Sequence, residues 1–174
     1  MSPIAHLGIG LLGWQVFDRK KTLGTLGMFF LAANLADIDF LFYMVFGPKP
    51  IFIHQYYTHN VPFILAGCGL LAFLLPRGRS RWGLLLTGLS HLLLDIIVID
   101  TLKPIGMRLF FPFSDTYYNL GFFPFLRRVP RKVMTSPHNF LVLGLEFACF
   151  VLPIWLLFRR RLARRFSSRA FWRL

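Results

Sequence analysis

Long apolar blocks separated by short basic clusters are the feature of this sequence that most restricts its fold. Five blocks can be drawn, at residues 4–17, about 23–46, about 61–75, about 82–102 and about 137–158. Blocks this long and apolar are typical of membrane-spanning helices, although the first is short for a full span. They lack the alternation of a β-barrel, and lipid offers no partner to an open sheet edge. We therefore predict an all-α, multi-pass transmembrane helical bundle with about four to five membrane segments.

The stretch from residue 104 to residue 126 differs from these blocks. It is rich in Phe and Tyr but is interrupted by residues such as Pro112 and Gly121. This mixture indicates a stretch that lies at the membrane interface or re-enters the bilayer. We expect residues 1–158 to form a single transmembrane helical domain. Residues 159–174 are expected to form a basic cytoplasmic tail on the lipid headgroups.

The net charge of +13 comes largely from basic clusters that lie between the apolar blocks. The clusters are Arg19–Lys21, Arg77–Arg81, Arg127–Lys132 and the stretch from residue 159 onward. Nucleic-acid binding is not expected, because no basic face is interleaved with base-stacking aromatics. With three clusters in the cytoplasm, the N-terminus lies outside and the C-terminus inside. The fourth cluster, with Arg127, Arg128, Arg131 and Lys132, then falls on the outer side. We interpret it as a candidate contact for a phosphate or a lipid headgroup.

Ionisable side chains inside a bilayer are costly and usually functional, so their depth is informative. At a helical rise of about 1.5 Å per residue, the candidates within the blocks lie roughly 14–25 Å from the cytoplasmic end. They are His6, Asp37, Asp39, His91, Asp95 and Glu146. His54, His59 and His138 fall on the outer side of the same topology. This agreement in depth predicts one shared site between mid-membrane and the outer face.

The sharpest local motif is His91-Leu-Leu-Leu-Asp95. Residues four apart share a helix face, so the imidazole and the carboxylate can bind one cation. The alternative is a hydrogen bond that satisfies two buried polar groups. The other candidate ligands at matching depth favour the metal.

Asp37 and Asp39 flank a single isoleucine, which points their carboxylates to different helix faces. One can then bind a metal while the other supports a ligand or binds a second ion. If the helix breaks locally, both can converge. The alternative is a pair of water-facing acids at the end of a span, which the apolar residues on both sides disfavour.

The remaining candidates are weaker when each is taken alone. His54 and His59 are five apart, which suits a loop leading into a helix better than one helical face. Either is also explained as an exposed loop histidine, and His6 is also explained as a core histidine. His138 and Glu146 are eight apart and lie only loosely on one side, so they are two further candidates.

Nitrogen and oxygen ligands without thiolate suit Zn²⁺, Mn²⁺ or Fe²⁺ better than Ca²⁺ or Cu⁺. More than four candidate ligands allow two or three ions. Such clusters activate water and clamp a phosphate during an in-line displacement. Zinc, as one to three ions, is therefore the expected cofactor, with manganese or iron as alternatives.

In these positions the chain resembles the YdjM family, which is described as membrane-bound metal-dependent hydrolases. The shared pattern is an early His, an Asp-Ile-Asp in the second block, His…Thr-His entering the third, and His-x-x-x-Asp in the fourth. A Lys-Pro-x-Gly turn follows at Lys103–Gly106, and the likeness covers roughly residues 1–115. That family is distantly similar to zinc-dependent phospholipase C and the P1-type nucleases, all-α enzymes whose three-zinc cluster cleaves phosphate esters.

The resemblance implies the same chemistry here, with metal ligands His6, Asp37, Asp39, His54, His59, His91 and Asp95. In catalysis, Asp37 or Asp39 would bridge metals or act as the base. The substrate would be a lipid or lipid-linked phosphate in a bacterial or archaeal inner membrane. The soluble enzymes use a His-x-x-x-Glu pair later in the chain. This sequence departs from that pattern, because Val142 stands four residues after His138. The alternatives are a divalent cation or proton transporter that uses the same cluster, and a scaffold that needs the metal only to fold.

Overall fold

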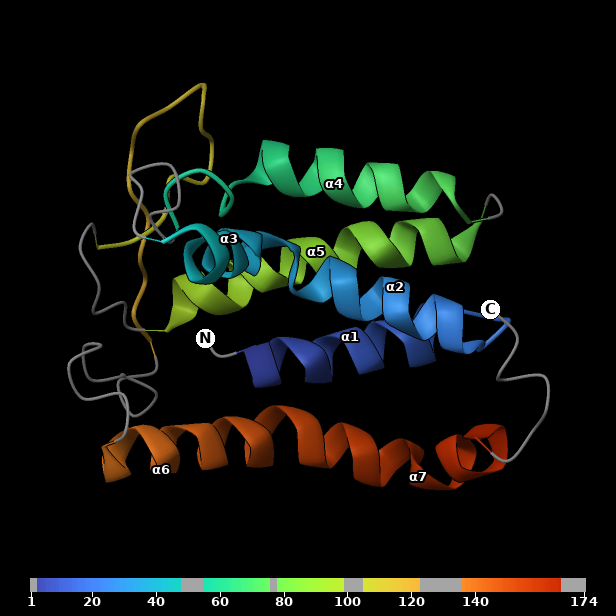
Figure 1. Ribbon diagram of the computed structural model, residues 1–174. Helices are drawn as coiled ribbons and strands as arrows, with labels where there is room; N and C mark the ends of the chain where they lie inside the picture. The colour runs from blue at the N-terminus through green and yellow to red at the C-terminus, as the bar shows by residue number, and fades with distance from the viewer. Residues whose placement is uncertain (1–2, 48–54, 76–77, 99–104, 123–135, 167–174) are drawn as a thin grey trace.

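The computed structural model describes residues 3–47, 55–75, 78–98, 105–122 and 136–166. The helices are α1 (Pro3–Phe17), α2 (Leu23–Ala33), the 3₁₀ turn η1 (Leu35–Asp37), α3 (Ile38–Phe46), α4 (Val61–Phe73), α5 (Arg79–Ile97), α6 (Pro137–Glu146), the π-helical turn η5 (Phe147–Val151) and α7 (Leu152–Phe166). Helices α1, α2, α4 and α5 pack together, and the continuous helix α6–η5–α7 runs along α1 on the outside (Figure 1). The described residues outside the helices form one isolated β-bridge, between Met107 and Tyr118, and no strand. The predicted all-α class is confirmed.

Local sequence accounts for several helix starts. Thr22 and Thr25 form a reciprocal cap on α2, in which each hydroxyl accepts the other residue's backbone N–H. Asn60 Oδ1 accepts from Phe63 N at 2.8 Å, and a proline follows Asn60 in the first turn of α4. Ser136 caps α6 in the same way, again ahead of a proline. Both α4 and α6 therefore begin where Asn or Ser and then Pro stand in the sequence.

The predicted second segment, residues 23–46, is not one helix. It breaks at Asn34 into α2, η1 and α3, and its two halves are bent by 67°. Asp37 N donates to the Asn34 carbonyl three residues back, at 3.0 Å, which is the tighter 3₁₀ pattern. The Ala33 carbonyl then accepts a hydrogen bond from another helix, which matters for the site.

The apolar core lies between helices α1, α2, α4 and α5. Trp14, Phe29 and Leu84 are fully buried there. Helix α5 approaches α4 closely at Gly88, where an added Cβ would lie 2.4 Å from Cys68 Sγ. This spacing leaves no room for a side chain at Gly88, so the glycine fixes the distance between the two helices.

A buried carboxylate joins three elements at the end of α1 far from His6. Asp18 accepts hydrogen bonds from Lys21 N at 2.7 Å, Thr25 Oγ1 at 2.7 Å and Ser80 Oγ at 3.0 Å. Because these donors come from the α1–α2 turn, from α2 and from α5, the network holds this end of the bundle together. We refer to it as the Asp18 network.

Among the described residues, helix length and composition are compatible with one or two membrane crossings. Pro137–Arg159 is long and apolar enough to cross a bilayer, and the bent pair formed by α2 with η1 and α3 passes the same test if it is counted as one span. Helices α1 and α4 are apolar but shorter. The predicted four to five membrane segments are therefore not confirmed. Two of the apolar blocks fold as helices of 15 and 13 residues, shorter than the roughly 20 residues that a straight span needs.

Candidate metal centre

Helix α5 carries the core of the site. The four-residue spacing of His91 and Asp95 places both on one face, and Nε2 of His91 lies 3.2 Å from Oδ2 of Asp95. Both side chains are buried. The pair faces α1 and not lipid, as a polar pair inside an apolar bundle must.

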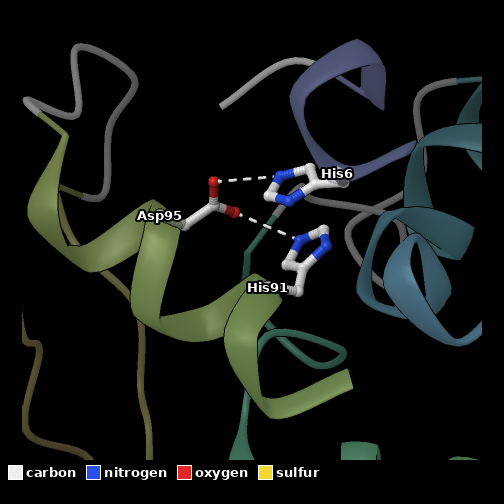
Figure 2. Close-up of side chains that lie close together, drawn as sticks. All are labelled: His6, His91 and Asp95. Atoms are coloured by element: carbon white, nitrogen blue, oxygen red, sulfur yellow. Dashed lines mark ion pairs between the residues drawn. The ribbon is translucent and has the colours of Figure 1, made fainter. Parts of the chain in front are cut away.

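Helix α1 adds His6 to this pair. Nε2 of His6 lies 3.3 Å from Oδ1 of Asp95, the carboxylate oxygen that His91 does not contact (Figure 2). The imidazoles of His6 and His91 stack with ring centroids 3.7 Å apart and planes inclined by 16°. Both ring nitrogens of His6 are buried and make no hydrogen bond with a described residue. A buried imidazole without hydrogen bonds is unfavourable, and a bound cation would satisfy it.

The helix break at Asn34 supplies both a ligand and an anchor. The Ala33 carbonyl accepts from Nδ1 of His91 at 2.7 Å. With its proton on Nδ1, His91 presents the Nε2 lone pair to the cluster. The turn η1 then places Asp37 beside it, with Oδ1 of Asp37 3.8 Å from Nε2 of His91. Asp37 Oδ2 is buried without a hydrogen-bond partner among the described residues.

His59 completes the group from the loop that precedes α4. Its Nε2 lies 3.4 Å from Nε2 of His91, 3.5 Å from Oδ1 of Asp37 and 3.5 Å from Oδ2 of Asp95. The side chain of His59 is fully buried. Four chain segments therefore converge on one small volume.

Asp39 lies behind His59 and outside this volume. Its Oδ2 accepts from Gln55 N at 3.0 Å and from Thr58 Oγ1 at 2.8 Å, and it lies 3.6 Å from Nδ1 of His59. Thr58 Oγ1 is also 3.1 Å from that nitrogen. A hydroxyl that donates to Asp39 can accept a hydrogen bond from Nδ1–H of His59, which would direct Nε2 of His59 toward the cluster.

The spacing of the ligand atoms fits a small divalent cation. A zinc ion with four nitrogen or oxygen ligands at about 2.0–2.1 Å separates neighbouring ligand atoms by about 3.3 Å. The five measured separations among His59, His91, Asp37 and Asp95 range from 3.2 to 3.8 Å. In two groups of three residues the candidate ligand atoms lie within 4.8 Å of one another: His6 with His91 and Asp95, and Asp37 with His59 and His91. The residues present would therefore fit one ion, or two ions of which only one could bind Nε2 of His91.

The electrostatics of the loop histidine also favour a cation. Burial by itself lowers the pKa of the His59 imidazole, but hydrogen bonds to Asp37, Asp39 and Asp95 raise that pKa well above its usual range. The surrounding carboxylates thus favour a positive charge at this point. A metal ion that binds here must displace that proton.

The other predicted site residues fall in two groups. His54, Arg127, Arg128, Arg131 and Lys132 lie outside the described residues. His138 is exposed at the start of α6, and Glu146 is fully buried in α6, but neither belongs to the two groups of three. Of the predicted ligands, the structure brings together His6, Asp37, His59, His91 and Asp95. Asp39 lies behind His59.

Sequence reasoning missed Arg108. It is buried in the aromatic segment 105–122, where its guanidinium contacts the loop that carries His59. The signal that could have revealed it is a single basic residue in the run Met-Arg-Leu-Phe-Phe, which has no nearby basic cluster.

One family comparison covers the whole site. The family described as YdjM inner membrane protein matches residues 1–163. No curated protein and no solved structure matches the chain.

Proposed function

Because the chain belongs to the YdjM family of inner membrane proteins, we propose that it is a membrane-embedded metal-dependent hydrolase. Its substrate is a phosphate ester of a lipid or of a lipid-linked group. The observation that carries the proposal is the convergence of His6, Asp37, His59, His91 and Asp95, from four chain segments, on one buried volume.

The ligands divide naturally between two positions. His59, His91, Asp37 and Oδ2 of Asp95 would hold one ion, while His6 and Oδ1 of Asp95 face a second position. Zinc suits these ligands, and manganese or iron would also be accepted. When bound, such an ion supplies Lewis acidity toward a phosphate oxygen and lowers the pKa of water.

The carboxylates take different roles in this arrangement. Asp37 has the most exposed side chain of the cluster, at 13%, and its Oδ2 has no hydrogen-bond partner in the part of the chain that the structure describes. It is therefore placed to take a proton from an attacking water. Asp95 points its two oxygens at different histidines, so it would contribute a ligand to both positions if two ions were bound. Asp39 acts on His59 and not on substrate.

A lipid substrate is favoured by the surroundings of Asp37, which is the least buried of the proposed ligands. Asp37 directly precedes α3, whose Leu41, Met44 and Val45 are 57–69% exposed. An outward apolar surface beside the accessible carboxylate suits approach from within the bilayer. In the proposed multi-pass topology, with about four to five membrane segments, the C-terminus is cytoplasmic and the site lies near the outer face. Arg127, Arg128, Arg131 and Lys132 remain the proposed headgroup contacts.

Cation or proton transport is disfavoured by the interior of the bundle. Along α1, α2 and α5, the positions between the cluster and the Asp18 network include the fully buried Trp14, Phe29 and Leu84. A conduction path needs polar groups along its length, and the side chains of Phe29 and Leu84 offer none. A metal used only for folding would produce binding without hydrolysis.

The test combines metal analysis with hydrolysis of phospholipids and other phosphodiesters by the purified full chain. His91→Ala and Asp95→Ala should lose metal and activity together. The exposed His138→Ala and the buried but distant Asp18→Asn are matched controls that should keep both. Metal retained in both cluster variants would refute the site. Metal uptake into liposomes without hydrolysis would support transport instead.

A further inference from the structure

Arg108 is a buried arginine that connects its own segment, residues 105–122, to the loop that carries His59. Its side chain is 6% exposed. One terminal nitrogen donates to Asp115 Oδ1 at 2.7 Å and the other donates to the Tyr56 carbonyl at 3.0 Å. The guanidinium carbon also lies 3.8 Å from the ring centroid of Tyr56 and 4.1 Å from that of Phe111. Tyr56 stands three residues before His59.

These contacts indicate support for the loop and not capture of a substrate anion. The charge of Arg108 is already compensated by Asp115, and both terminal nitrogens are engaged. Its Nε is buried without a hydrogen bond to a described residue, which is a cost that the other contacts must outweigh. A planar guanidinium, whose donors have a fixed geometry, is suited to binding Asp115 and the Tyr56 carbonyl at the same time.

Leu109, the residue after Arg108, is attached to the chain on the other side of His59. The Leu109 carbonyl accepts from Val61 N at 2.8 Å, two residues after His59. Arg108 and Leu109 therefore attach to the loop on both sides of the ligand. Since backbone positions 56 and 61 are both fixed, the loop between them has little freedom to withdraw the imidazole.

The same segment is also attached to the helix that carries the other ligands. Leu120 N and Gly121 N donate to the Ile96 carbonyl at 2.7 and 3.3 Å, immediately after Asp95. Met107 and Tyr118 pair through two backbone hydrogen bonds and join the two ends of the segment. In Figure 1 the segment lies at the end of the bundle where α5 finishes and α3 begins. It thus connects the loop of His59 to the end of α5.

We propose that Arg108 is a positioning residue that holds His59 at the metal centre by fixing the Tyr56 carbonyl. The inference rests on the proposed function, because it requires that His59 is a metal ligand. Residues that orient a ligand typically contribute roughly 10–100-fold to metal affinity. Loss of Arg108 should therefore weaken metal binding and change the ligand set, and not only lower the stability of the fold.

The probe is Co²⁺, whose visible absorption reports the number and arrangement of its ligands. The purified full chain is titrated as wild type, Arg108→Ala, Arg108→Lys and Asp115→Asn. Arg81→Ala is the matched control, because Arg81 also donates to a backbone carbonyl, that of Leu75, and contacts a ring, but in the α4–α5 turn. Thermal unfolding is measured alongside.

We expect Arg108→Ala to bind Co²⁺ roughly 10–100-fold more weakly, with an altered spectrum. Arg108→Lys should recover part of the affinity, and Asp115→Asn and Arg81→Ala should keep the wild-type spectrum. If Arg108→Ala does not fold, Arg108→Lys carries the same readout. A wild-type affinity and spectrum in the folded Arg108 variant overturns this inference alone. Equal weakening in Arg81→Ala also overturns it. Absence of Co²⁺ binding by the wild type overturns the metal site itself, and the role of Arg108 with it.

Discussion

Replacing Asp39 with alanine would distinguish the residues proposed to bind the metal from those proposed to hold the ligands in place. Oδ2 of Asp39 accepts hydrogen bonds from Gln55 N at 3.0 Å and from Thr58 Oγ1 at 2.8 Å. The same oxygen lies 3.6 Å from His59 Nδ1. Without it, the buried Thr58 hydroxyl loses its acceptor, and Nδ1 of His59 loses the nearby carboxylate that favours a proton on that nitrogen. The imidazole is then no longer held with Nε2 toward the cluster.

The size of the effect follows from this indirect role. Groups that orient a ligand typically contribute about 10–100-fold to affinity, so the zinc dissociation constant should rise by about that factor. This corresponds to about 1.4–2.7 kcal/mol of binding free energy. Asp37→Ala removes a ligand atom itself and should cost more. Asp39→Asn keeps one oxygen as an acceptor and should cost less than Asp39→Ala.

The assay is competition for zinc between the purified protein and a chelating dye. Asp18→Ala is the control, since it also removes a buried carboxylate with three donors but lies at the other end of the bundle. It should lower the melting temperature without changing zinc affinity. Equal losses for Asp39→Ala and Asp37→Ala would make Asp39 a direct ligand. An unchanged affinity would show that Asp39 does not hold His59, and either result refutes the reasoning.

Three further predictions concern protons, packing and metal removal. Because contacts with carboxylates raise the pKa of His59, a proton competes with zinc below that pKa. Apparent zinc affinity should therefore rise by about tenfold per pH unit up to that pKa and level off above it, as dye competition at several pH values would show. Gly88→Ala would force a Cβ to within 2.4 Å of Cys68 Sγ, so unfolding should show a loss of about 1–3 kcal/mol. The open Gly69→Ala position should show no such loss. Zinc at 100 times its dissociation constant should stabilise the fold by about 2.7 kcal/mol, and a chelator or His91→Ala should abolish that gain in a thermal melt.

The parts of the site that sequence predicted well are those set by a single helix. The four-residue spacing of His91 and Asp95 is a local property, and the structure places their side chains 3.2 Å apart. The depth argument likewise grouped His6 with them, because the rise of a helix is nearly constant. The pairing of His91 with Asp95 needs only the helical state to be right, and it is. The depth argument also needs the predicted membrane topology, which is not confirmed.

The parts that depend on long-range contacts were less predictable. The apolar run from residue 23 to residue 46 gives no clear stop signal, yet the helix breaks at Asn34, where His91 binds the Ala33 carbonyl. The break decides between the alternatives for Asp37 and Asp39, since only Asp37 enters the cluster. The predicted number of membrane segments was not confirmed by helix length for a related reason. An apolar block records composition, but caps and tertiary contacts set where a helix begins and ends.

The two kinds of ligand also differ in how they can vary. His91 and Asp95 are fixed to each other by the backbone of α5, so substitution there removes a ligand outright. His59 stands in a loop, and its position depends on Asp39, on the Tyr56 carbonyl and on the residues that bind them. Changes in those supporting residues shift a ligand without deleting it. Metal affinity, and with it any activity, is therefore most readily tuned through Asp39 and Arg108, whereas the helical pair determines whether the site exists at all.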